Sequence, residues 1–432
     1  MARKMKDSGI EWIEEIPEGW EITRLKYLAD FEPTCDTSYL TDESKITYTP
    51  MECVKNGGFE NRSALYGNLS HTLTPFQNGD IAMAKVTPCF ENGNIAIMDN
   101  LFSGFGLGSS ELFVFRPKSI STRYFFYWLQ NKAFVARACS TMTGTGGLKR
   151  ISPSFIRNCP VHCPSTDEQT KISDYLDAKC SEIDDLLTSV HSSIEKYKKL
   201  KQAVITQAVT KGVRGKREMK DSGNPWFGQI PTDWKLSRVG LHFSIILGKM
   251  LCNAPLNDTY TLEPYYCAAD VHFDGVADGE RKKMWFSPIE KDLYRVSVGD
   301  LLVVEGGAGA GGSAIVENQD SYTYIQNSIM IVRSKGNTDN RYLRYLLEFL
   351  VKQGYIDIVC NKATIPHFTK DKLSGVPFCL CPTGEQEEIA DYLDAKCAEI
   401  DGLIAKKEQL VKELESYKKS LIYEVVTGKR EV

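Results

Sequence analysis

The 432-residue sequence is a tandem duplication, and this feature constrains its fold more than any other. Met5-Lys-Asp-Ser-Gly9 recurs as Met219-Lys-Asp-Ser-Gly223, at an offset of 214 residues. Asp174–Asp184 recurs as Asp391–Asp401 at an offset of 217, with ten of eleven residues identical. Identity of that extent at a nearly constant offset predicts two halves that share one fold. The stretches between these segments are only faintly similar, so the centres of the two halves have diverged.

A long helix is predicted at the end of each half. Apolar residues follow a four-three spacing after Thr166 and again after Thr383, and a proline precedes each start. The spacing is typical of a coiled coil about 65 Å long rather than of a helix lying on its own domain. A glutamine three residues after each threonine predicts a capping box at both starts. The packed stripe is expected to include Leu176, Ile183, Leu187, Val190 and Ile194 in the first helix and Leu393, Ile400, Ile404, Val411 and Leu414 in the second.

Each half is expected to be a mixed domain followed by its helix, an α+β architecture. Short strand-like runs such as Glu111–Phe115 are separated by Gly and Pro, and shorter helices are predicted over 122–138 and 340–355. Antiparallel pairing of the long helices would give the chain pseudo-twofold symmetry, with a domain near each end. The predicted division is a domain at 1–165, a helix at 166–210, a basic linker at 211–218, a domain at 219–382, a helix at 383–427 and a tail at 428–432.

Composition excludes several classes of protein. An apolar fraction of 42% supports packed cores and excludes a disordered chain. No run of 18 apolar residues occurs, and the first residues include no apolar signal-peptide block, so we expect no contact with a membrane. The thirteen cysteines are expected to be reduced thiols of a cytoplasmic protein. The two domains are nearly neutral, with 17 basic and 17 acidic residues in the first and 17 and 18 in the second, so any DNA contact requires local patches.

Motifs for catalysis are weak or incomplete. Phe102-Ser-Gly-Phe-Gly106 matches a short pattern of S-adenosylmethionine loops, but it lies between two strand-like runs and opens no helix. Glu305–Gly312 resembles a dinucleotide loop, but the strand-like run after it favours a flexible hairpin that reaches a groove. Cys159, His162 and Cys163 have no second ligand pair at metal-binding spacing. We therefore expect a non-enzymatic chain with no metal and no cofactor of its own.

The duplicated sequence resembles the specificity subunit of type I restriction-modification enzymes over essentially the whole chain. The resemblance is carried by the Met-Lys-Asp-Ser-Gly…Trp…Ile-Pro…Trp openings at 5–20 and 219–234, the Gly-Asp-Ile/Leu turns at 79–81 and 299–301, and the Glu-Gln-x-x-Ile-x-x-Tyr-Leu-Asp helix starts at 168–177 and 385–394. It implies two target recognition domains for a bipartite, asymmetric site in double-stranded DNA. It also implies a helix pair that sets the spacer and docks two adenine methyltransferase subunits, which in turn can bind a restriction subunit. S-adenosylmethionine, ATP and Mg²⁺ are then expected on the partner subunits.

The divergent loops hold the residues predicted to touch DNA. Phosphate contacts need Lys or Arg, and base contacts need polar side chains on loops that enter a groove. Residues that read a sequence should differ between the halves, whereas scaffold residues such as Trp12, Trp20, Trp226 and Trp234 should match. The candidates are Lys85, Thr87, Thr143, Thr145, Lys149 and Arg150 in the first domain and Lys249, Arg281, Lys282, Lys283, Asn361, Lys362 and Thr364 in the second.

Two other functions stay open on the sequence alone. The neutral domains would suit a coiled-coil scaffold that binds other proteins and no DNA, although divergence confined to the globular centres argues against it. A methyltransferase in its own right would need a cofactor loop, which the motifs above do not supply. Cofactor binding by the isolated chain would favour that third function.

Overall fold

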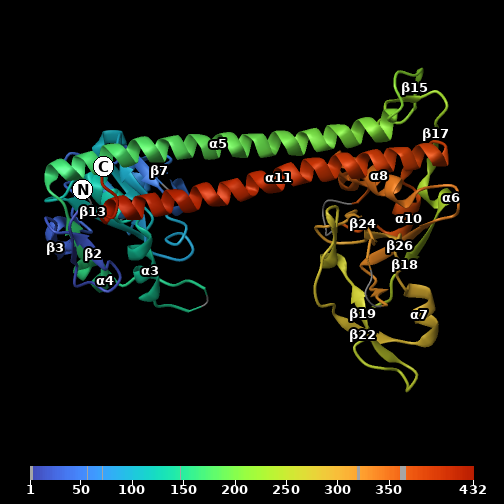
Figure 1. Cartoon of the computed structure of the whole chain (residues 1–432), viewed down its shortest axis with the longest axis horizontal. Helices are drawn as coiled ribbons and strands as arrows, with labels where there is room; N and C mark the ends of the chain where they lie inside the picture. Colours follow the sequence, from blue (N-terminus) through green and yellow to red (C-terminus); the bar gives the residue numbers. More distant parts are fainter. Residues whose placement is uncertain (1–2, 56, 71, 146, 319–321, 361–365) are drawn as a thin grey trace. The chain divides into compact units, whose positions relative to one another are not determined.

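The computed structural model describes residues 3–55, 57–70, 72–145, 147–318, 322–360 and 366–432 (Figure 1). Two compact units make up the chain. Unit 1 comprises Met1–His191 and Glu408–Val432, and unit 2 comprises Ser192–Lys407. Each unit therefore contains one globular domain and one half of each long helix, so its core joins segments that are far apart in the sequence.

Two four-stranded sheets form the domain of unit 1. The order β11-β10-β13-β4 is antiparallel throughout, and the order β8-β5-β12-β9 includes one parallel pair, β12 with β5. Side chains alternate along β10, so Ile81 faces the cluster that holds α2, whereas Ala82 packs with Phe76 on the other face. The strands are β4 (Ala29–Phe31), β5 (Lys45–Thr49), β8 (Arg62–Leu65), β9 (Thr74–Gln77), β10 (Asp80–Ala84), β11 (Ile95–Met98), β12 (Phe105–Gly108) and β13 (Leu112–Pro117).

Short strand pairs and helices complete unit 1. β1 (Met5–Asp7) pairs with β2 (Glu15–Pro17), and β3 (Glu21–Arg24) pairs with β14 (Pro160–Cys163) directly before the long helix. The remaining elements are the small pair β6 (Val54–Lys55) and β7 (Gly58–Phe59) and the helices α1 (Leu25–Leu28), α2 (Thr122–Trp128), α3 (Lys132–Ser140) and α4 (Pro153–Asn158).

Unit 2 repeats this plan. Its main sheet has the order β24-β23-β26-β18, which corresponds strand for strand to the first sheet of unit 1, and its second sheet, β22-β19-β25, again contains a parallel pair. This confirms that the two halves share one fold. The strands are β18 (Phe243–Leu247), β19 (Thr261–Tyr266), β22 (Lys283–Phe286), β23 (Leu301–Val304), β24 (Ser313–Ile315), β25 (Tyr324–Ile325) and β26 (Ile329–Ser334).

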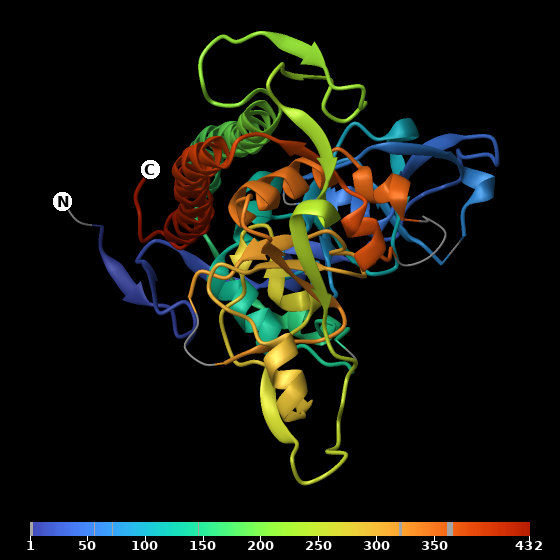
Figure 2. The same cartoon turned by 90° about the vertical axis from the view of Figure 1, so that its right-hand side faces the viewer.

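The peripheral elements of unit 2 match those of unit 1 except for one helix, α7 (Pro288–Tyr294), where unit 1 has a 3-10 turn at Tyr66–Asn68. They are the pairs β15 (Met219–Asp221) with β16 (Gln229–Pro231), β17 (Lys235–Arg238) with β27 (Pro377–Leu380) and β20 (Val271–His272) with β21 (Gly275–Val276), and the helices α6 (Val239–His242), α7, α8 (Asn340–Lys352), α9 (Tyr355–Val359) and α10 (Lys370–Ser374). Within this unit, α7 and the antiparallel pair of β19 and β22 lie at the end farthest from α11 in both Figure 1 and Figure 2.

The long helices are α5 (Thr166–Lys211) and α11 (Thr383–Val426), and within each unit they lie side by side in opposite directions (Figure 1). Their predicted stripe is confirmed as the packed face. Leu176, Ile183, Ile194, Leu393, Ile400 and Val411 are buried, and Leu187, Val190, Ile404 and Leu414 are half-buried. An ion pair bridges the helices in each unit: Lys418 bonds Asp184 at 2.7 Å, and Lys201 bonds Asp401 at 2.6 Å. Among the described residues, no helix is long and apolar enough to cross a membrane.

The predicted capping boxes are wrong. Gln169 does not turn back to cap its own helix; its Oε1 accepts the Ser121 N–H at 2.8 Å and its Nε2 donates to Pro164 O at 3.0 Å. Gln386 accepts the Asp339 N–H at 3.1 Å in the same way. Each glutamine is buried between the helix and its domain, where the unpaired backbone groups at the start of α2 or α8 attract it more than the local N–H does.

The shorter helices are also interrupted where one helix was predicted. The stretch 122–138 is divided because α2 ends at Trp128 and Asn131 begins α3, accepting the Phe134 N–H at 2.9 Å. The stretch 340–355 ends early, since α8 stops at Lys352 and Gly354 has a φ of 87° before α9. Local capping therefore overrides the apolar periodicity in both places.

Candidate nucleic-acid interface

An equivalent set of contacts, here called the joint, fixes each domain on the first turn of its long helix. Trp20 Nε1 donates to Glu168 Oε2 at 2.9 Å, and Trp234 Nε1 donates to Glu385 Oε2 at 3.2 Å. Arg3 pairs with Glu168, and Arg217 pairs with Glu385. These groups are repeated and packed, which confirms that Trp20 and Trp234 belong to the scaffold; Trp12 and Trp226 are half-buried within their own units.

A buried aspartate fixes the central strand of each main sheet. Asp80, at the start of β10, accepts two hydrogen bonds from the Arg116 guanidinium, both at 2.8 Å, and these bonds raise the pKa of Arg116. Asp300, at the start of β23, accepts two from Arg333 at 2.7 and 2.6 Å. Gly79 precedes the first turn with a φ of 86°, a conformation that favours glycine. Because both strands start from the same turn, the loops at their far ends occupy equivalent positions in the two domains.

The six predicted DNA-contact residues of unit 1 lie close together. Four are in the loop 143–150, and Lys85 and Thr87 are in the segment that is hydrogen-bonded to it. Thr143 and Arg150 exchange backbone hydrogen bonds of 3.0 and 2.9 Å and so close a hairpin that follows α3. Thr87 is buried; its Oγ1 donates to Gly147 O at 2.8 Å and accepts the Lys149 N–H at 2.9 Å. Thr145, at the tip, is exposed. Thr87 therefore shapes this hairpin from below.

The basic groups of this loop differ in how available they are. Arg150 forms two hydrogen bonds of 2.8 Å with Glu111, and these lower the pKa of the Glu111 carboxyl. Lys85 is half-buried, and its Nζ lies 5.4 Å from the centroid of the Phe113 ring. Lys149 is exposed, and its ammonium has no ion pair in the part of the chain that the structure describes. Lys149 is thus the most available cation of the hairpin for a phosphate.

The second domain commits Lys249 to internal contacts. Its side chain is buried, its Nζ lies 2.5 Å from Glu290 Oε2, and the rings of Tyr260 and Phe286 lie 4.9 and 5.3 Å away. Burial alone would raise the pKa of Glu290, but the hydrogen bonds from Lys249 and Ser287 outweigh it and leave that pKa lowered. Sequence reasoning missed this pair because Glu290 lies 41 residues away, on another element.

The other candidates of unit 2 are divided between internal and exposed positions. Arg281 pairs with Asp270 at 3.2 Å and lies over the Tyr266 ring at 4.8 Å. Lys282 and Lys283 are exposed at the start of β22. Asn361, Lys362 and Thr364 lie outside the described residues. DNA contact stays a prediction for every candidate in both units.

The weak catalytic motifs occupy structural positions. Phe102–Gly104 forms a short 3-10 turn that leads into β12, so no helix N-terminus follows it. His162 is buried, its Nε2 lies 2.5 Å from Val426 O, and its Nδ1 accepts the Trp128 Nε1–H at 3.5 Å. Burial lowers the pKa of His162 to about 4. The described residues contain no group of three or more His, Cys, Asp or Glu side chains that could hold a metal ion.

In a comparison with known protein families, the model of the type I restriction modification DNA specificity domain matches residues 17–196 and again 232–413. Specificity subunits of type I restriction enzymes are similar as well. Those named EcoEI and EcoAI, from Escherichia coli, are 36% and 38% identical over 163 residues, which cover 37% of this chain but only 27% of each relative. The MjaX subunit of Methanocaldococcus jannaschii, itself named as putative, is 25% identical over 96% of this chain and 95% of its own.

Solved structures agree with the fold. A chain of a type I restriction-modification system, solved to explain complex assembly and conformational transition, has a TM-score of 0.73 at 18% identity and covers 95% of this chain and 98% of its own. The HsdS subunit of Thermoanaerobacter tengcongensis has a TM-score of 0.53 at 18% identity, with coverage of 96% and 98%. At this identity the likeness supports the architecture alone.

Proposed function

The chain belongs to the type I restriction-modification DNA specificity family, and we propose that it reads a bipartite, asymmetric DNA site, one half-site for each unit. One observation carries the proposal. The two domains share a frame, set by Asp80–Arg116 and Asp300–Arg333, but present different loops at equivalent ends of that frame. A shared frame with divergent loops suits two domains that bind different DNA half-sites in the same orientation.

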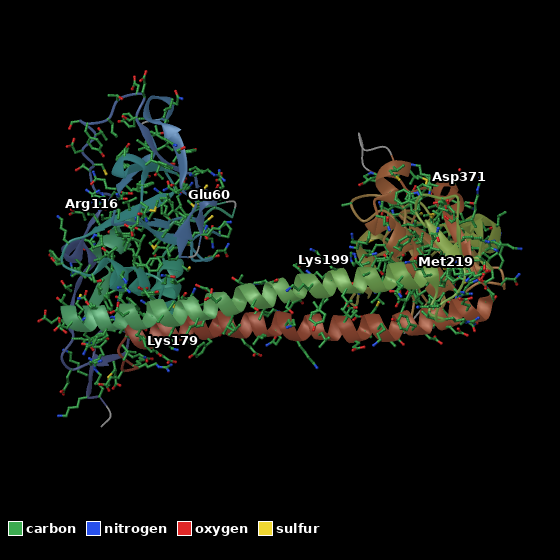
Figure 3. The ribbon with its side chains drawn as sticks, turned by 90° about the horizontal axis from the view of Figure 1, so that it is seen from above. Glu60, Arg116, Lys179, Lys199, Met219 and Asp371 are labelled. Atoms are coloured by element: carbon green, nitrogen blue, oxygen red, sulfur yellow. The ribbon has the colours of Figure 1, made fainter. Side chains whose placement is uncertain are left out.

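We further propose that the long helices dock two methyltransferase subunits. The support is a set of at least partly exposed residues that is repeated in both units. Tyr175, Lys179 and Glu182 follow an i, i+4, i+7 spacing on one face of α5, and Tyr392, Lys396 and Glu399 repeat it on α11. Lys179 pairs with Glu182 at 2.7 Å and Lys396 with Glu399 at 2.8 Å, and these four side chains are about half exposed (Figure 3 marks Lys179 on α5).

Exposed side chains on a solvated helix are otherwise free to differ between the units. Tyr392 is 40% exposed and Leu186, on the same side of α5 as Lys179, is 53% exposed, so each face adds apolar surface to its charges. A partner that binds once to each unit in the same way accounts for the repetition. S-adenosylmethionine, ATP and Mg²⁺ would then bind to partner subunits, and this chain would act by positioning them, without a catalytic group of its own.

A base-resolution map of adenine methylation tests the proposed function. Cells that express the partner methyltransferase are compared with and without this chain. A bipartite motif that appears only with the chain is the expected result. If the complex forms and no chain-dependent motif appears, the protein is instead a coiled-coil scaffold that binds proteins without reading DNA.

Two further variants separate reading from docking. Replacement of residues 32–150 by the corresponding segment of another family member should change one half-site and leave the other intact. Tyr175→Ala combined with Tyr392→Ala should weaken assembly with the methyltransferase, measured by light scattering of the mixed subunits. Tyr39→Ala removes a tyrosine that, like Tyr392, is exposed, at 54%, but lies in the domain, so it serves as the control and should leave assembly unchanged.

A further inference from the structure

We propose that Glu305 is a specificity-determining residue of the second half-site, where its carboxylate accepts a hydrogen bond from the exocyclic amino group of a cytosine or an adenine. This inference rests on the proposed function of the chain as a reader of DNA. Glu305 is acidic, so the sequence criteria for DNA contact, which were basic and small polar side chains, do not select it. Three features of the structure carry the inference.

Glu305 occupies the same place in unit 2 that Lys85 occupies in unit 1. The Lys85 N–H donates to Glu111 O and its carbonyl accepts the Ile151 N–H, both at 3.0 Å. The Glu305 N–H donates to Ser328 O at 2.8 Å and its carbonyl accepts the Phe368 N–H at 2.6 Å. Each residue thus follows the central strand of its main sheet and is held between the same two neighbouring segments.

The charges at this place are opposite in the two units. In unit 1, Lys85 lies close enough to Glu111 to help lower its pKa, and Arg150 neutralises the same carboxylate. In unit 2, Ser328 stands where Glu111 does, and its hydroxyl bonds Gln326 at 2.5 Å. The Glu305 side chain is half-buried, and its carboxylate forms no hydrogen bond or ion pair in the part of the chain that the structure describes.

Glu305 is also the only side chain of its loop that can form hydrogen bonds. Residues 305–312 read Glu-Gly-Gly-Ala-Gly-Ala-Gly-Gly, so every other position is glycine or alanine. Gly307 has a φ of 89°, and nothing lies within 4 Å of where its Cβ would be, whereas Gly311, with a φ of 83°, packs against Ile356 and Val351 of its own unit. The loop can therefore approach a groove closely, with one carboxylate as its polar group.

Chemistry then restricts what this carboxylate can bind. An ionised glutamate only accepts hydrogen bonds, so a phosphate repels it, and so do base edges that offer only acceptors. The N4 amino group of cytosine and the N6 amino group of adenine are the donors exposed in the major groove. Lys85, which only donates, would suit the opposite set of base edges at the matching place of the first half-site.

The test uses the full complex with the methyltransferase and compares methylation motifs of the native chain, Glu305→Ala and Glu305→Lys. Glu317→Ala is the control, because Glu317 is an exposed glutamate elsewhere in unit 2. The expected result is relaxed discrimination, at least about fivefold, at one cytosine or adenine position of the second half-site. Glu305→Lys should further disfavour that base, and the control should keep the native motif.

The outcomes distinguish this inference from the proposed function. If the native chain gives a bipartite motif and both Glu305 variants keep it unchanged, Glu305 does not read a base, although the chain still reads DNA. If the native chain gives no motif, the proposed function itself fails. If a variant no longer supports methylation, selection of binding sites from random duplexes by the assembled complex replaces the readout: a preference lost at one base supports the inference, and an unchanged site overturns it.

Discussion

The two units agree where each domain meets the helices and differ where the loops end. Arg123 binds Asp174 at 2.9 Å and also pairs with Asp177, and in unit 2 Arg341 binds Asp391 and Asp394, both at 2.8 Å. Far from this joint, a lysine in one unit is replaced by a glutamate in the other. Duplication has therefore kept the contacts that fix a domain on a helix, among them the buried hydrogen bond from Trp234 to Glu385, and has allowed the outward-facing loops to differ.

The repeated joint is not equally buried in the two units. Glu385 is fully buried, whereas the side chain of its counterpart Glu168 is 26% exposed. A second difference lies behind each tryptophan, where His162 in unit 1 occupies the place of Cys379 in unit 2. Similar contacts in different surroundings should have different energies, as tested at Glu385 and His162, whereas contacts with similar surroundings should have equal energies, as tested at the buried glutamines and the helix lysines.

The largest effect is expected at Glu385. Glu385→Gln removes the fully buried carboxylate that pairs with Arg217, which keeps only its ion pair with the exposed Asp233, and should cost unit 2 about 4 kcal/mol of unfolding free energy. Glu168→Gln should cost unit 1 only about 1 kcal/mol, since water reaches both Arg3 and Glu168. Hydrogen exchange followed separately on peptides of the two units measures both losses. Equal losses would show that burial does not distinguish the two joints.

The next effect depends on pH and should appear in unit 1. Burial lowers the pKa of His162 to about 4, below its ordinary value of 6.5, so the unfolded state binds the proton more readily between these values. The stability from the neutral imidazole is complete above pH 6.5 and is lost as the pH falls to about 4, by about 3 kcal/mol.

The matched control is His162→Cys, which copies Cys379. Burial raises the pKa of the Cys379 thiol to about 12, so it binds no additional proton in acid. Exchange protection of unit 1 at pH 5 and pH 7.5 should differ in the native chain and converge in the variant, apart from the acid response of other groups. If the native chain and the variant lose protection equally at pH 5, His162 is not the source of the acid sensitivity.

A smaller and symmetric effect is expected at the two buried glutamines. Gln386→Leu leaves the Asp339 N–H and the Cys381 carbonyl without their partner, and Gln169→Leu does the same to Ser121 and Pro164. Each substitution should cost its own unit about 2 kcal/mol, because an unpaired buried polar group loses its hydration. Urea unfolding of each variant gives the loss. A difference above about 1 kcal/mol between the two would break the equivalence of the joints.

The smallest effect is expected at the lysines between the helices. Lys201→Met and Lys418→Met remove ion pairs whose aspartates are about half exposed, at 49% and 54%. Water can solvate those carboxylates and Met can fill the apolar seam, so each change should stay within about 1 kcal/mol. Thermal unfolding of both variants tests this. A loss of several kcal/mol in either one would mean that the pair is structurally required.

The fold was largely predictable from repetition and period. The repeated segments predict one fold used twice, and the four-three spacing from Leu176 to Ile194 predicts which side of α5 is packed. Both properties are local, since neighbouring residues of a helix determine which face they share. The interruption at Asn131 was not predicted, because a capping residue in an apolar stretch leaves the period almost unchanged.

The candidate site was predicted less well. The sequence determined that the two halves have diverged in their loops, and it identified the hairpin that holds Lys149. Only the tertiary structure showed that Lys249 forms an ion pair with Glu290, while the Glu305 carboxylate has no partner in the described part of the chain. Strand register and residues far along the chain determine whether a charged side chain pairs within the protein or remains available to a ligand. The sequence by itself therefore determined the duplicated scaffold and its helices, and the packing of each unit decided which of its polar groups remain available.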